Sequence, residues 1–185
     1  MKENIANHQN LLSVFAILIK YGIITNKEIT DWADSILASE AASDYAFIEI
    51  STSTSTYDLI KILEKNAMNK NPEMVCRAIL GIVYHLLTKQ LIAFKDSLKV
   101  VSEISYEEKL TEDEQFLLYG YSESSSYELQ GVYESFRLYR ENFFEFLSLY
   151  KNFTLTNHRE WSSIHETLLT ELSEKLEMVK GNYPY

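Results

Sequence analysis

The fold is decided by residues 71–88, which read NPEMVCRAILGIVYHLLT. Asn, Pro and Glu in that order are a typical helix start: Asn caps free N–H groups, Pro has the backbone angle of a first helical residue, and an acid suits the positive end of the helix dipole. Residues 74–87 are apolar nearly all round the helix, which predicts a central, buried helix. Gly81 inside it costs about 1 kcal/mol against Ala, so we expect another helix to cross closely there.

On both sides of this stretch, apolar residues recur at spacings of three and four, the pattern of amphipathic helices. Thr25 with Glu28, and Thr111 with Glu114, have the spacing of capping boxes, in which a hydroxyl and a carboxylate satisfy free N–H groups at a helix start. Gly22 suits the end of the first helix. We expect helices over residues 5–21, 26–39, 57–67, 72–88, 91–105, 112–119, 127–150 and 157–180.

Residues 45–56 are ambiguous. Residues 45–50 fit either a short strand or a helical turn, and residues 51–56 alternate Ser and Thr. We interpret the hydroxyl run as a loop whose last members cap the helix that follows, with a strand as the alternative. The sequence therefore predicts an all-α protein, with a single domain over residues 1–185, about eight helices and one short irregular or strand-like segment near residues 45–56.

Composition narrows the classes of function. The chain has 185 residues, of which 46% are hydrophobic and 24% charged, as in a folded domain. Its net charge of −10 disfavours nucleic acid and anionic membranes as partners. A single Cys cannot build a disulfide framework or a cysteine zinc site. The apolar run at residues 14–19 is too short to span a membrane, and no signal-peptide pattern precedes it, so we expect a cytoplasmic protein without membrane contact.

No sequence motif indicates an enzyme. The five glycines are scattered and cannot form a phosphate loop, and neither a nucleophile elbow nor a His-Glu-x-x-His pattern occurs. His158 and His165 are seven residues apart, which places their rings roughly 10 Å apart on a helix, too far to share one metal ion. We therefore expect no catalytic residue, no cofactor and no metal.

Charge is concentrated in one segment. Residues 103–134 contain nine acidic residues against Lys109 alone, a net charge of −8, and tyrosines are frequent in and beside this segment. One interpretation is a solvated acidic surface whose tyrosines lie partly in the core. The other is a protein-binding face, because tyrosine is enriched at interface hot spots and acidic residues attract a basic partner. The candidate partner-binding residues are Glu107, Glu108, Glu112, Asp113, Glu114, Tyr119, Tyr121, Glu123, Tyr127, Glu128, Tyr133 and Glu134.

Residues 21–34, YGIITNKEITDWAD, contain a helix end, a turn, a capping box and a helix with a Trp. This run resembles a pattern found in small helical bacterial proteins, some of which are similar to immunity proteins encoded beside polymorphic toxins. The resemblance implies an all-helical, non-enzymatic protein that neutralises its partner by binding. It implies no particular site residues.

The leading hypothesis is therefore a non-catalytic, immunity-like binding protein that covers a basic toxin domain through its acidic, tyrosine-rich face. The alternative is a helical scaffold or regulator that forms homo-oligomers through the aromatic helix at residues 127–150. A third hypothesis is an enzyme whose site collects His85, or His158 with acids from other helices.

Overall fold

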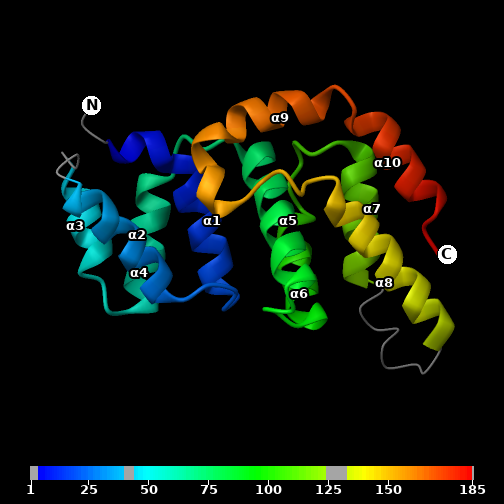
Figure 1. Ribbon diagram of the computed structural model, residues 1–185, viewed down its shortest axis with the longest axis horizontal. Helices are drawn as coiled ribbons and strands as arrows, with labels where there is room; N and C mark the ends of the chain where they lie inside the picture. Colours follow the sequence, from blue (N-terminus) through cyan, green and yellow to red (C-terminus); the bar gives the residue numbers. More distant parts are fainter. Residues whose placement is uncertain (1–3, 40–43, 124–132, 185) are drawn as a thin grey trace. The chain divides into compact units, whose positions relative to one another are not determined.

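The structure is a computed structural model that describes residues 4–39, 44–123 and 133–184, with side chains from residue 136 onward in the last range. The described residues form ten α-helices, two 3₁₀ helices and no strand, which confirms the all-α class and exceeds the expected eight helices by two. The chain divides into two compact units, Met1–Asn71 and Pro72–Tyr185 (Figure 1). The single domain expected for residues 1–185 stays a prediction.

The N-terminal unit consists of short helices that pack in pairs. Its elements are η1 (Ile5–His8), α1 (Gln9–Lys20), α2 (Asn26–Ala38), α3 (Tyr45–Ser51) and α4 (Thr56–Asn66). Helix α1 packs against α4, α2 packs against α3, and α3 also contacts α4. The ring of Trp32 lies 5.4 Å from that of Phe15 and 5.9 Å from that of Phe47, measured between centroids, so one aromatic cluster joins α1, α2 and α3.

The predicted helix boundaries of this unit are confirmed where the sequence contains a cap. Gly22 has φ +67° and its N–H donates to the Ile19 carbonyl, which closes α1 in the left-handed conformation that favours glycine. The Thr25 amide donates to Glu28 Oε2 over 2.7 Å and the Glu28 amide to Thr25 Oγ1 over 3.3 Å, the expected capping box.

Residues 45–51 are a helix, so the strand alternative is wrong. Ala46, Phe47 and Ile50 are buried, and their spacing is that of one helix face. The Asp44 side chain caps α3 by accepting from the Ala46 amide. Ser55 accepts from the Asp58 amide over 3.3 Å, so the end of the hydroxyl run caps α4 as expected.

The C-terminal unit is built around α5. Its elements are α5 (Pro72–Thr88), α6 (Phe94–Ile104), α7 (Glu112–Glu123), α8 (Tyr133–Ser148), η3 (Leu155–Glu160), α9 (Trp161–Leu169) and α10 (Leu172–Gly181). Helix α5 is buried along most of its length and packs against α6, α8 and α9. Helix α7 packs against α6 and α10, and α10 also contacts α8 and α9. The helix expected at residues 72–88 is therefore central within this unit.

The close approach expected at Gly81 is present, but the partner is the chain that follows α8 rather than a helix. A Cβ on Gly81 would lie 2.2 Å from the Tyr150 carbonyl oxygen and 2.8 Å from Phe153 Cβ. His85 lies half-buried on the same helix, with its Nε2 2.6 Å from the Lys151 carbonyl oxygen. These contacts seat residues 150–153 on α5.

Three of the predicted helices differ clearly from the structure. The helix expected over residues 112–119 continues through Gly120 to Glu123 as α7. Helix α8 begins its described part at Tyr133, and residues 127–132 lie outside the described residues. The helix expected over residues 157–180 is three elements, with non-helical backbone angles at Asn157 and at Glu171, the residue before α10. None of the described helices is long and apolar enough to cross a bilayer.

Candidate partner-binding surface

Helix α7 carries most of the described candidate residues, and it begins at the second predicted capping box. The Thr111 amide donates to Glu114 Oε2 over 2.9 Å, and the Glu114 amide donates to Thr111 Oγ1 over 3.2 Å. Both contacts satisfy N–H groups that a helix start leaves free. Thr111 and Glu114 therefore determine where the helix begins.

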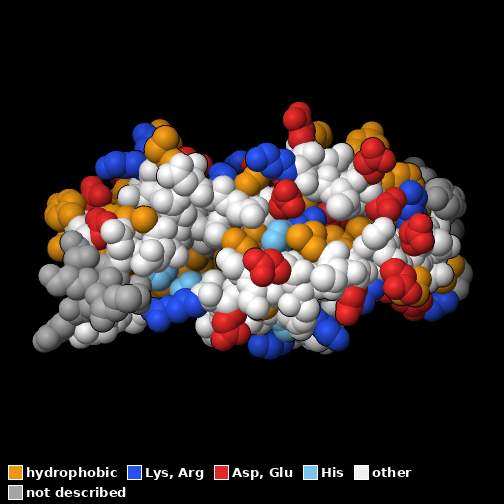
Figure 2. All heavy atoms as spheres, turned by 90° about the horizontal axis from the view of Figure 1, so that it is seen from above, with side chains coloured by type: hydrophobic (Ala, Val, Ile, Leu, Met, Phe, Trp, Pro, Cys, Tyr) orange, Lys and Arg blue, Asp and Glu red, His pale blue; other side chains and the backbone are white. Residues whose placement is uncertain are grey.

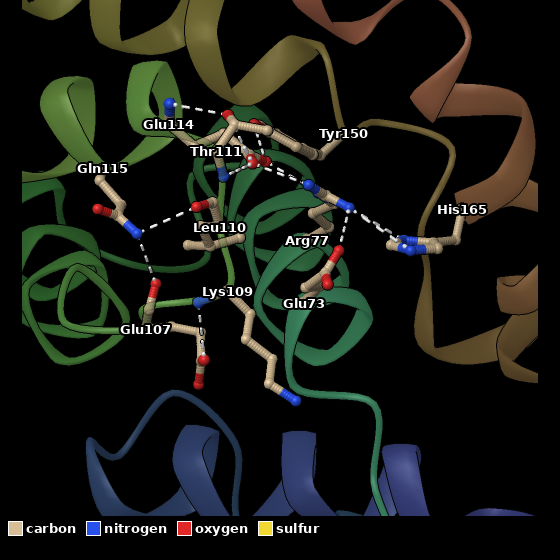
Figure 3. A network of polar contacts seen from close by, with 10 residues as sticks. All are labelled: Glu73, Arg77, Glu107, Lys109, Leu110, Thr111, Glu114, Gln115, Tyr150 and His165. Carbon is tan, nitrogen blue, oxygen red and sulfur yellow. Dashed lines mark hydrogen bonds and ion pairs between the residues drawn. The ribbon is translucent and has the colours of Figure 1, made fainter.

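Glu114 also lies at the centre of a buried polar network (Figure 3). Arg77 of α5 donates Nε to Oε1 over 2.9 Å and Nη2 to Oε2 over 2.8 Å, a bidentate ion pair in which both side chains are at most 1% exposed. The Tyr150 hydroxyl donates to Glu114 Oε1 over 2.9 Å. Glu114 therefore joins α7 to α5 and to the segment after α8, and its burial removes it from the predicted partner-binding face.

The pKa directions follow from this burial and pairing. Burial alone would raise the pKa of the Glu114 carboxyl, but the hydrogen bonds and charge of Arg77 outweigh it and hold that pKa below its ordinary value. Burial acts to lower the pKa of the Arg77 guanidinium, but the hydrogen bonds and charge of Glu114 outweigh it, so that pKa lies above its ordinary value. Burial, together with the Glu114 carboxylate, raises the pKa of the Tyr150 hydroxyl. The site therefore holds one full ion pair and a neutral tyrosine.

The remaining donor of Arg77 faces a carboxylate and a histidine. Nη1 lies 3.3 Å from Glu73 Oε2, and 3.4 and 3.5 Å from the two ring nitrogens of His165 on α9 (Figure 3). Burial and the neighbouring Arg77 charge lower the pKa of His165, which favours the neutral ring at neutral pH. The network thus connects α5, α7, α9 and the segment that follows α8.

Tyr121 is a second candidate that the structure places in the core. Its hydroxyl donates to Asn142 Oδ1 over 2.6 Å, and its carbonyl accepts from the Tyr139 hydroxyl over 2.6 Å. Burial raises its pKa far above the ordinary value. Tyr121 is fully buried, so it is also removed from the predicted partner-binding face.

The outward face of α7 has an acidic and aromatic stripe. Glu112, Phe116, Tyr119 and Glu123 are separated by four, three and four residues, which places them on one side of the helix, and all four are exposed. Phe116 is 40% and Tyr119 57% exposed. We call these four residues the α7 stripe; its ends lie about 16 Å apart at 1.5 Å per residue.

The turn before α7 adds Tyr106, Glu107 and Glu108 to the same segment. Tyr106 is 77% exposed, Glu108 is exposed and Glu107 is partly exposed. Within the described part of the chain, Glu108 forms no ion pair. Asp113 differs, because the Lys180 ammonium lies 2.6 Å from its carboxylate and offsets its charge.

The structure does not describe the side chains of the four remaining candidates. Tyr127 and Glu128 lie outside the described residues, as do the side chains of Tyr133 and Glu134. On the side of the C-terminal unit seen in Figure 2, acidic side chains are spread singly among polar and apolar ones. The candidate surface is therefore the α7 stripe with the preceding turn.

The rings of α8, the surface expected for self-association, point mainly inward. Tyr139, Phe143 and Phe146 are buried, as is Tyr150 just after the helix, and Phe144 is half-buried. The aromatic character of this segment thus serves mainly the core of the C-terminal unit.

The sequence interpretation missed two residues that matter here. Arg77 is a charged residue inside an apolar run, a signal that a buried partner is needed. Phe116 shares a helix face with Glu112 and Tyr119, and this spacing was visible in the sequence.

Among the described residues, no group of three or more His, Cys, Asp or Glu side chains could hold a metal ion. Comparison with protein-family models, curated proteins and solved structures gave no match.

Proposed function

We propose that this chain is a non-catalytic binding protein of the immunity type, which neutralises a basic protein partner by covering it with the α7 stripe. The observation that carries the proposal is that α7 exposes two aromatic rings beside carboxylates, while its Leu117 and Leu118 are buried as in an ordinary amphipathic helix. It buries Glu114 and Tyr121 and exposes Phe116 and Tyr119. Exposed aromatic rings flanked by carboxylates offer large contact area together with attraction for a basic surface.

The buried network supports this role because it holds the helix in place. Glu114 is bound by Arg77 of α5, by Tyr150 after α8 and by its own cap residue Thr111, so the first turn of α7 is anchored to two other segments. A rigid helix loses little conformational freedom when it binds. The stripe is thus presented in one fixed orientation within its unit.

A photo-crosslinking experiment tests the proposal. A photoreactive phenylalanine analogue replaces Tyr119 in the full chain, expressed in the source cells, and Tyr57 of α4 is the matched control because it is 66% exposed. We expect Tyr119 to give a crosslink to a protein of basic charge, and Tyr57 not to give it. The proposal is wrong if the two positions give the same products or if position 119 gives none.

Charge reversal then tests the electrostatic part. Glu112→Lys should slow association with the crosslinked partner several-fold at low salt and weaken its salt dependence, because the exposed carboxylate contributes to attraction over about 10 Å at 0.1 M salt. Glu64→Lys on α4 is the control at another exposed position. Equal effects of the two substitutions would contradict a role for the α7 stripe. Glu114 is unsuitable for this test because its reversal would bury a cation beside Arg77.

A further inference from the structure

A groove lies on the C-terminal unit among the end of α8, the connection to η3, and helices α9 and α10. Its volume is about 680 Å³, within the range of about 300–1,000 Å³ that ligand sites occupy. The connection returns from α8 along α9, and α10 follows α9 (Figure 1). The groove is separate from the α7 stripe, none of whose four residues lines it.

The lining combines an apolar interior with charged edges. Its apolar side chains come from three segments and include Leu149, Phe153, Ile164, Leu168 and Met178. Met178 lines the groove together with Leu168, and its side chain is 56% exposed. The described residues therefore leave this apolar surface open. Its neutral polar groups are partly engaged within the chain; for example, the Thr167 hydroxyl donates to the Ser163 carbonyl over 2.9 Å.

The walls of the groove are held in place. The Trp161 indole N–H donates to the Thr154 carbonyl over 3.0 Å and fixes the start of α9. Gly81 allows the close contact with Tyr150, and His85 contacts the Lys151 carbonyl, so the connection after α8 is held on α5. A site that is already formed costs little conformational entropy when a ligand enters it.

The charges at the edges select the occupant. Glu171 is paired with Lys175 over 2.5 Å, so these two charges offset each other. Glu145 and Glu160 form no ion pair with another described residue, and Lys151 is the remaining lining cation. Two carboxylates against one ammonium favour a cationic ligand, and the apolar interior favours one with an apolar side.

We propose that this groove binds an amphipathic helix of a partner protein, with leucine-like side chains in the interior and lysine or arginine beside Glu145 and Glu160. The lining residues from Glu160 to Leu168 extend over about 12 Å, or roughly two helical turns. That length accommodates apolar side chains at i, i+3 or i+4, and i+7, the pattern of helix-in-groove recognition. This inference stands independently of the proposed function, because its residues are different.

The probe is a fluorescent synthetic helix of about 14 residues, four turns, with Leu on one side and Lys on the other, added to the full chain. The groove variants are Leu168→Ser and Glu160→Lys. Their matched controls are Leu169→Ser, since Leu169 is exposed on the same helix but does not line the groove, and Glu177→Lys on α10. Circular dichroism checks that each variant is folded, and fluorescence anisotropy measures binding.

We expect Leu168→Ser to weaken binding about tenfold or more, since it removes most of a leucine contact, and Glu160→Lys to weaken it several-fold. Both controls should stay within about twofold of the unchanged chain, and a peptide with Glu in place of Lys should bind more weakly. The inference is overturned if neither peptide binds, if the controls weaken binding equally, or if the Glu peptide binds as well. It is also overturned if sedimentation shows self-association that Leu168→Ser abolishes, because the occupant would then be a second copy of the chain.

Discussion

Arg77→Met is the substitution that most directly tests the buried network. It leaves the Glu114 carboxylate fully buried, with Tyr150 and Thr111 as its remaining donors. Breaking a buried ion pair by removing one partner costs about 3–5 kcal/mol, because the other charge stays buried without compensation. We expect the free energy of unfolding of the C-terminal unit to fall by that amount at pH 7.

The chain allows a clean assay. It contains two tryptophans, Trp32 in the N-terminal unit and Trp161 in the C-terminal unit. In a Trp32→Phe background, the fluorescence of the buried Trp161 reports urea unfolding of the C-terminal unit. Lys175→Met is the matched control: it breaks the exposed pair with Glu171, for which we expect little or no loss of stability.

The pH dependence gives this prediction a definite sign. In the unchanged chain the folded pKa of Glu114 is below its ordinary value of 4.5, so its stabilising contribution is present above pH 4.5 and is lost as the pH falls through the folded pKa. In Arg77→Met, uncompensated burial raises that pKa, so the folded variant takes up a proton as the pH falls towards 4.5. The stability difference between the two proteins should therefore be largest at pH 7 and smaller near pH 4.5.

A double-mutant cycle completes the test. Glu114→Leu alone should also cost about 3–5 kcal/mol, and Arg77→Met with Glu114→Leu should cost less than the sum of the single losses by about 2–3 kcal/mol. The reasoning is refuted if Arg77→Met costs no more than Lys175→Met, or if its cost is the same at both pH values.

Three further substitutions test the close approach at Gly81, the lowered pKa of His165 and the backbone conformation of Gly22. Gly81→Ala gains helix propensity, but its Cβ would lie 2.2 Å from the Tyr150 carbonyl oxygen. We expect the free energy of unfolding, measured in urea, to fall by about 1–3 kcal/mol. A gain in stability would contradict the close approach. His165→Gln should reduce the loss of stability as the pH falls below 6.5, because burial and the charge of Arg77 lower the pKa of His165 and folding therefore releases its proton in that range. An unchanged pH profile would contradict this lowered pKa. Gly22→Ala should cost about 1–2 kcal/mol, because φ is +67° there; a neutral result in thermal unfolding would exclude strain at this helix end.

Local chemistry explains why many helix boundaries could be predicted. Thr25 with Glu28, Thr111 with Glu114, and Gly22 act within four residues of themselves, so the sequence around them contains the whole interaction. Residues 45–51 were ambiguous because a short apolar run fits both a strand and a helix until burial selects one face. The split of the last helix at residue 171 was not visible from apolar spacing, which continues across it.

The sequence by itself determined the helical class, the central place of α5 within its unit and the caps, because these depend on periodicity and on neighbours along the chain. Only the tertiary structure decided which acidic and tyrosine residues reach the surface. Glu114 is acidic and caps its own helix, yet it is buried because it forms an ion pair with Arg77, 37 positions earlier in the chain. Tyr119 and Tyr121 are two residues apart and lie on opposite sides of α7, one exposed and one buried. Side chains distant in sequence decide which of these residues are buried, because a polar group is buried only where a hydrogen-bond or charge partner is available.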